Sequence, residues 1–132
     1  MGSLRWGRIV LGGILGECIL IAAIVPIRLA GGSEDVVTDV AVGGSFVAFV
    51  LVAWLLGRSI NRPMLNGVLM GAAAAAVYIL TGLVARLFVP DAPPTPFIYN
   101  VAHALKLAGG ATGGWLAQRA SPRTASHTAR IG

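Results

Sequence analysis

Charged side chains are scarce in this sequence. Of its 132 residues, 11% are charged and 56% are hydrophobic, whereas soluble domains carry about 25% charged residues. So few charges exclude an ordinary soluble domain, and the mean hydropathy of +0.81 predicts an integral membrane protein. The formal net charge of +5 does not indicate a nucleic-acid partner, because the basic residues stand at the ends of apolar segments rather than in one stripe.

Cysteine and histidine are scarce too. The single cysteine, Cys18, excludes an intramolecular disulfide and a cysteine-rich metal site. His103 has no second histidine or cysteine at the spacing of a metal site, so we expect no metal and no cofactor. The sequence shows no nucleophile, base and acid in a catalytic pattern, and we therefore expect the chain not to be an enzyme.

Long apolar stretches, in contrast, fill most of the chain. Four of them are each long enough to cross a bilayer as a helix. They span about residues 6–27, 36–56, 64–89 and 97–116. Because the connections are short, we expect one all-α membrane domain over residues 1–116, with four transmembrane helices in an up-down bundle. Residues 117–132 are polar and rich in Ser, Thr and Arg, and we expect them to form a disordered basic tail in the cytoplasm.

Capping and breaking residues set the expected ends of these helices. Pro26 lies near the end of the first segment, where it can stop a helix without breaking its middle. Ser33 is expected to cap the second helix, with Glu34 and Asp35 complementing its dipole. Pro63 stands where it can open the third helix.

The arginines indicate an orientation. Cytoplasmic loops of membrane proteins carry an excess of Lys and Arg. We therefore expect both termini in the cytoplasm and a multi-pass protein of the cytoplasmic (inner) membrane, of bacterial type. The arginine-rich side holds Arg5, Arg8, Arg58, Arg62, Arg119, Arg123 and Arg130, and the other side holds Arg28 and Arg86 with Glu34, Asp35, Asp39 and Asp91.

The two halves of the chain resemble each other in short stretches. Residues 8–15 match residues 62–69, and residues 54–59 match residues 115–120. These matches are typical of a parallel duplication of a two-helix hairpin. The alternative is that membrane helices in general share Leu, Gly and flanking Arg.

Two ionisable side chains stand deep in the apolar segments, Glu17 in the first and Lys106 in the last. A lysine at the bilayer centre costs roughly 2.5–3.5 kcal/mol on insertion scales, so it needs a partner, a cavity or a role. Counted at about 1.5 Å per residue from the cytoplasmic helix ends, both lie near mid-membrane. We expect either a structural ion pair or a titrating site that exchanges a proton. A pore, a lipid headgroup or a partner subunit remain as alternatives.

His103 is the third member of this expected polar site. On a helical wheel it shares one face of the last segment with Tyr99 and Lys106, and this face should turn toward the bundle interior. We interpret it as an interior histidine rather than a metal ligand. Asp39 and Arg86, near the outer ends of their segments, form a further candidate pair, with an ordinary interfacial role as the alternative.

Glycine is concentrated in the last segment. Two interleaved patterns with glycines four residues apart indicate close helix packing, either inside one chain or between chains. They consist of Gly109, Gly110, Gly113 and Gly114.

The residues that lead to Glu17 carry one resemblance. Residues 11–17 read Leu-Gly-Gly-Ile-Leu-Gly-Glu and resemble the first helix of the small multidrug resistance transporters. That resemblance implies a four-helix protein whose membrane-embedded glutamate binds protons and cationic drugs. The second segment lacks the proline-containing stretch of that family, and Lys106 would neutralise a site for a cationic drug.

These features predict a small polytopic membrane protein of one of two kinds. The first is a non-enzymatic oligomerising or accessory subunit, whose partners are membrane lipids and either copies of itself or another membrane subunit. The alternative is a small proton-coupled transporter that uses Glu17 with Lys106.

Overall fold

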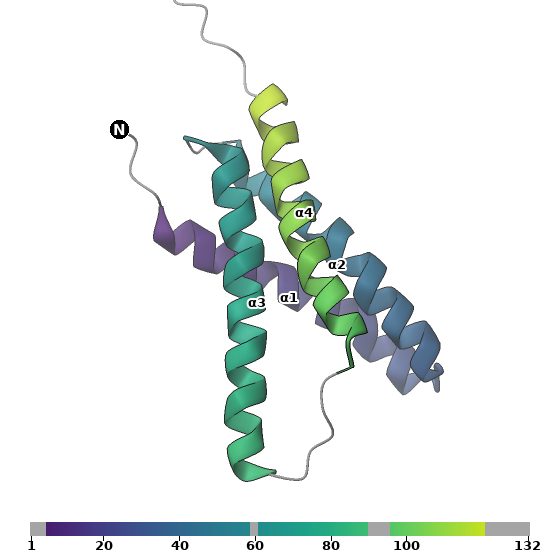
Figure 1. Cartoon of the computed structure of the whole chain (residues 1–132). Coiled ribbons are helices and arrows are strands. Elements are labelled where there is room, and N and C mark those ends of the chain that lie inside the picture. Colours follow the sequence, from purple (N-terminus) through teal and green to yellow (C-terminus); the bar gives the residue numbers. More distant parts are fainter. Residues whose placement is uncertain (1–4, 59–60, 90–95, 121–132) are drawn as a thin grey trace, which may run out of the picture.

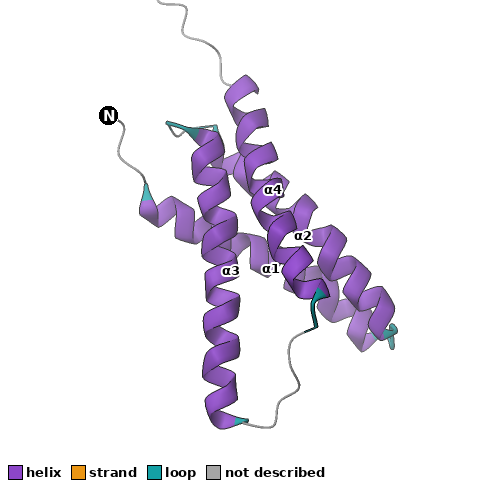
Figure 2. Ribbon diagram, in the orientation of Figure 1, coloured by secondary structure: helices purple, strands orange, loops and turns teal. Residues whose placement is uncertain are grey.

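Four helices make up the computed structural model, which describes residues 5–58, 61–89 and 96–120. Each helix runs back against the preceding one (Figure 1), and the described residues contain no strand (Figure 2). The prediction of an all-α four-helix bundle is confirmed. In chain order the helices are α1 (Trp6–Leu29), α2 (Glu34–Gly57), α3 (Pro63–Phe88) and α4 (Ile98–Ala120).

The capping residues act at the expected places. Ser33 is the N-cap of α2, where its hydroxyl accepts a hydrogen bond from the Val36 N–H (3.4 Å), and Pro63 is the first residue of α3. Helix α1 continues to Leu29, two residues beyond its predicted end, because Pro26 removes only its own N–H from the helical ladder. Gly31 then turns the chain toward α2 with φ at +79°, a conformation that favours glycine.

Helix α4 is longer than the sequence suggested. We expected it to end near residue 116, with disorder from residue 117, but residues 117–120 are helical. Ala117 is fully buried against Gly57 of α2, and this packing holds the last turn in place. The rest of the expected tail, residues 121–132, lies outside the described residues.

Three helices, α1, α2 and α3, are each long and apolar enough to cross a membrane. Large apolar side chains on their outer surfaces are exposed, as expected for helices that face lipid. Those of α1 include Val10, Leu11, Ile14, Leu15, Ile19 and Ile21. The chain is therefore a multi-pass membrane protein.

The fourth helix differs from the other three in composition. At 23 residues, or about 35 Å, α4 is long enough to cross, but it does not reach the hydropathy of a membrane span. The expectation of four apolar crossings thus holds for three helices by length and composition. The reason is that the polar side chains of Asn100, His103, Lys106 and Gln118 lower the hydropathy of α4.

Helix α4 packs against α2 and α3 through its glycines, all of which are buried (Figure 1). Gly109 and Gly113 face backbone carbonyls of α2, while Gly110 and Gly114 face α3. A Cβ atom at any of the four would lie under 3.0 Å from a backbone atom of the neighbouring helix. Each of the two interleaved patterns therefore serves one neighbour, and both are used inside this chain.

Helix α1 packs on the other side of the bundle, against α2 and α3. Its Gly12 lies against the Met70 side chain and its Gly16 against the Phe49 ring. Phe49 and Met70 are among the largest fully buried side chains. The core thus lies between α1 and the pair α2 and α3, with α4 on the far side.

Helices α2 and α4 end with the same kind of contact, an arginine side chain over a tryptophan ring. The Arg58 guanidinium lies 3.7 Å from the centre of the Trp54 ring, and that of Arg119 lies 3.9 Å from the Trp115 ring. These are the residues of the second sequence match, so the proposed duplicated hairpins share a local geometry there. The duplication itself stays a prediction.

We predict that Gly110→Ala destabilises the protein. The added methyl group would overlap the Gly67 carbonyl and push α3 away from α4. Overpacking of this kind costs about 1–3 kcal/mol. The measurement is the thermal unfolding of the purified protein in detergent.

Gly43→Ala is the matched control, because a Cβ atom at Gly43 would have nothing within 4 Å. It should leave stability unchanged or raise it slightly, since alanine is the better helix former. Equal stability of the two variants would contradict the assigned packing of α4.

Candidate functional site

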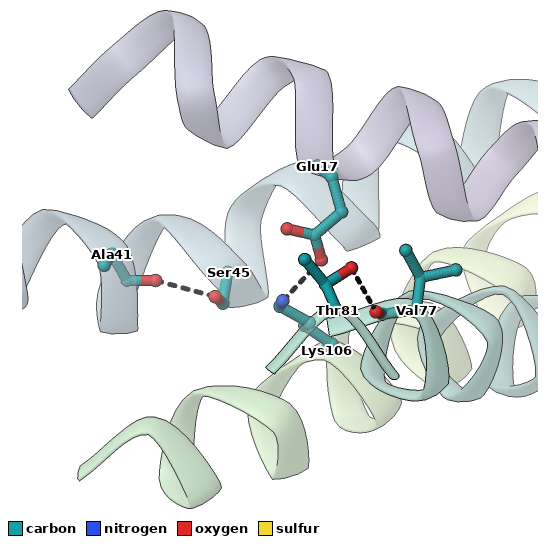
Figure 3. A network of polar contacts seen from close by, with 6 residues as sticks. All are labelled: Glu17, Ala41, Ser45, Val77, Thr81 and Lys106. Carbon is teal, nitrogen blue, oxygen red and sulfur yellow. Dashed lines mark hydrogen bonds and ion pairs between the residues drawn. The ribbon is translucent and has the colours of Figure 1, made fainter. Parts of the chain in front are cut away.

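Glu17 and Lys106 meet inside the bundle. The Lys106 ammonium donates a hydrogen bond to the Glu17 carboxylate, and the two form an ion pair across 89 residues of sequence. Figure 3 shows the side chains pointing toward each other from α1 and α4. The two deep charges of the sequence thus lie together.

The pair links helices that do not otherwise touch through their backbones. No Cα atom of α1 lies within 8 Å of one in α4, whereas every other pair of helices has such contacts. Helices α1 and α4 therefore occupy opposite corners of the bundle. The long glutamate and lysine side chains bridge the gap that the backbones leave.

Lys106 is the more enclosed member of the pair. Its side chain is 5% exposed, and that of Glu17 is 25% exposed. The backbone of α4 at Lys106 lies directly against Gly71 of α3, which brings the lysine deep into the bundle. Its Nζ atom lies 6.0 Å from the centre of the Phe49 ring and 5.8 Å from that of Tyr78, at the outer limit of cation–π attraction.

The pair borders a cavity, which we call the ion-pair cavity. Its volume is about 280 Å³, and all four helices contribute to its walls. Aliphatic side chains make up the rest of the lining, so the polar groups converge on an otherwise apolar space. These polar groups are Glu17 from α1, Ser45 from α2, Tyr78 from α3, and Tyr99, His103 and Lys106 from α4.

His103 lies beside the pair, as the sequence suggested. Its ring is 4.7 Å from that of Tyr78, which in turn stacks on Tyr99 at 6.2 Å. The Nδ1 atom of His103 is buried and has no hydrogen-bond partner among the described residues. The histidine therefore has hydrogen-bonding capacity that the surrounding side chains do not use.

Sequence reasoning missed two polar members of this wall, Tyr78 and Ser45. Ser45 is buried, and its hydroxyl donates to the Ala41 carbonyl (2.6 Å), as Figure 3 shows. Tyr78 follows a run of alanines in an apolar segment, with no motif around it. The available signal was that Tyr78 and Tyr99 are the only tyrosines in the sequence.

Two further cavities adjoin this site. One, of about 180 Å³, lies between α3 and α4 and includes Arg86 and Asn100; we call it the Arg86 cavity. It shares Tyr78 and His103 with the ion-pair cavity. The other, of about 290 Å³, lies between α1 and α3, is lined by apolar residues and Cys18, and includes Glu17. Glu17 therefore lines two of these spaces.

The expected pair of Asp39 and Arg86 is not formed. Both residues are exposed, and no ion pair joins them within the described part of the chain. Arg28 instead pairs with Glu34 (2.6 Å) across the turn between α1 and α2. The physical reason is that the C-terminal half of α3 diverges from α2, as Figure 1 shows, so Arg86 does not approach Asp39.

A metal site is not indicated by the described residues, which contain no group of three His, Cys, Asp or Glu side chains placed to hold an ion. Comparison with known proteins gives no match: no protein-family model, no curated protein and no solved structure matches this chain. The site is therefore interpreted from its own geometry.

We predict that Glu17 and Lys106 are energetically coupled. Glu17→Gln or Lys106→Met alone leaves one charge in the bundle without its partner. The double change should therefore lower the free energy of unfolding by less than the sum of the two single changes. Residues in contact couple by about 0.5–3 kcal/mol, and couplings inside membranes average about 0.6 kcal/mol. The free energy of unfolding of wild type, both single variants and the double variant gives the coupling.

The exposed pair of Arg28 and Glu34 is the matched control. Its side chains are 47% and 74% exposed, so Glu34→Gln should change stability by less than about 0.5 kcal/mol. If the effects of Glu17→Gln and Lys106→Met on the free energy of unfolding simply add, the two buried residues are not energetically coupled.

Proposed function

We propose that the protein is a small proton-coupled membrane transporter whose exchange site is the pair of Glu17 and Lys106. The observation that supports this most is the cavity beside the pair. A pair that only fixes two helices gains nothing from an adjoining space, because the space removes packing contacts from its walls. Here Glu17 lines two cavities, and one of them also contains Lys106.

Protonation of Glu17 is the proposed coupling step. Ionised, the carboxylate neutralises Lys106 and holds α1 to α4. When it takes up a proton, the attraction is lost and the lysine is left with its charge and three donors. Because the backbones of α1 and α4 do not touch, this step would free the two helices to move relative to each other.

An accessory or oligomerising subunit is the second candidate. The glycines that favoured it are used inside the chain, which removes one of its supports. What favours it now is the second half of α3, in which residues 76–88 are all exposed. Tyr78 contacts α4, but Leu87 and Phe88 are 78% and 81% exposed, so the end of this half-helix could pack against another membrane subunit.

Four membrane crossings with both termini in the cytoplasm belong to the same proposal. The crossing of α4 is supported by its position against α2 and α3 and by the pairing of Lys106 with a residue in the middle of α1. The orientation is supported by the arginines at one end of the bundle. On this basis we assign the protein to the cytoplasmic (inner) membrane.

We predict that reporter fusions place residue 132 in the cytoplasm and the turn at residues 30–33 outside it. The distribution of arginine requires this orientation if α4 crosses. The measurement uses paired reporters that are active on opposite sides of the membrane. If the reporter at the C-terminus is active only outside the cytoplasm, the chain crosses the membrane three times or has the opposite orientation.

We also predict that Glu17 binds a proton reversibly in the folded protein. Infrared difference spectra between neutral and acidic pH should show a protonated carboxyl band in the wild type that is missing from Glu17→Gln. Glu34→Gln, which removes the other ion-paired glutamate of the described residues, should retain the band. If Glu17 stays ionised wherever the fold persists, the pair is structural and the subunit candidate takes precedence.

A further inference from the structure

We propose that the ion-pair cavity binds one small organic anion, together with one proton that Glu17 takes up. This inference rests on the proposed function and names its substrate class. Its basis is the balance of charge in the cavity walls, the position of the lysine and the connection to the Arg86 cavity.

The charge of the site sets the sign of the ligand. Among the described residues, Glu17 is the only acidic side chain that lines the ion-pair cavity, and none lines the Arg86 cavity. With Glu17 ionised the pair is neutral, and with Glu17 protonated it carries one positive charge. Because Lys106 is almost completely enclosed, it stays in the cavity wall in either state. The site is therefore never net negative while the lysine keeps its proton, and it does not favour a cation.

The exchange is balanced in charge and in atoms. A proton from the aqueous side binds a Glu17 carboxylate oxygen, and the contact between Glu17 and Lys106 breaks. The anion then forms a contact with the Lys106 ammonium in place of Glu17. The cavity is neutral before and after, so no charge is left uncompensated in the membrane interior. One anion thus enters with one proton.

Other titratable groups face the same space. His103 and Tyr99 come from α4 with Lys106, Tyr78 comes from α3, and α2 contributes only the hydroxyl of Ser45. His103 is the one other candidate proton acceptor near neutral pH. We assign the proton to Glu17 because only this group competes directly with the anion for Lys106, and a His103 variant separates the two.

The size and walls of the cavity suggest the body of the ligand. A water molecule takes about 30 Å³ of liquid volume, so about 280 Å³ accommodates an organic ion with one ring. The walls away from the pair are aliphatic and aromatic, as a ligand with an apolar body and a single anionic head requires. His103 lies in the same wall as Lys106 and adds a second polar side chain there.

The Arg86 cavity provides a path for the anion. It shares Tyr78 and His103 with the ion-pair cavity, so the contact between these two rings is the boundary between the spaces. Arg86 lies in the wall of the first space and Lys106 in that of the second. An anion that passes the ring pair moves from one positive side chain toward another.

The test uses benzenesulfonate, an anion that carries no titratable proton, and phenyltrimethylammonium, a cation of similar size. Binding to the full-length protein in detergent is measured by calorimetry in buffers of different ionisation enthalpy, at several pH values. We expect benzenesulfonate to bind with uptake of about one proton, and its affinity to rise about tenfold per pH unit as pH falls through the range where Glu17 is ionised. Phenyltrimethylammonium should not bind.

The variants assign the groups. Glu17→Gln should bind benzenesulfonate with no proton uptake and no pH dependence, because Lys106 is then always free. Lys106→Met should lose binding, whereas Lys106→Arg keeps the charge and should retain it. His103→Gln should still take up the proton, and Glu34→Gln should behave like the wild type. Thermal unfolding of each variant shows that it is folded.

Several results would overturn the inference: no binding of benzenesulfonate by the wild type, binding without proton uptake, binding that survives in folded Lys106→Met, or equal binding of the cation. Any of these with a Glu17 infrared band present rejects the anion and leaves proton coupling in place. Loss of the infrared band rejects the proposed function itself. The two failures are thus distinguished.

Discussion

A lysine enclosed in the interior of a membrane bundle is the constraint on which this arrangement depends. The Lys106 ammonium has little access to solvent, so a negative charge must lie beside it. Glu17 supplies that charge from α1, on the opposite corner of the bundle. Contact between the two fixes how α1 and α4 are rotated and how high each stands in the membrane, since a shift of one helical turn, about 5.4 Å, would part the charges.

Glycine makes this contact geometrically feasible. Gly71 lets the backbone of α4 approach α3 at Lys106, and Gly16 makes room for the Phe49 ring one residue before Glu17. Helix α4 thus comes close to α3 where the facing residue is small, while α1 and α4 stay apart where the two charges bridge them. The space that remains around the pair is the ion-pair cavity, so the packing that positions the charges also creates the cavity.

The sequence predicted the fold class and the central pair because both follow from strong local signals. Apolar length predicts helices, and two isolated deep charges must be compensated. It failed for Asp39 and Arg86, because equal depth does not make two residues neighbours when their helices diverge. It gave no sign of Tyr78, since the place where α3 faces α4 depends on how the glycines pack. It ended α4 too early, because the last turn is stabilised by Ala117 against Gly57 rather than by its own composition.

The asymmetry of the pair favours the proposed transporter over a purely structural pair. A structural pair is most effective when both partners are enclosed, because exposure weakens the attraction and adds no contact. Here the lysine side chain is enclosed, while the glutamate side chain is a quarter exposed. In the proposed exchange, the residue that takes up the proton is therefore the more accessible one, and the residue that holds the anion stays enclosed. In such a site the enclosed positive charge of Lys106 determines the sign of the ligand, and the apolar walls determine its shape.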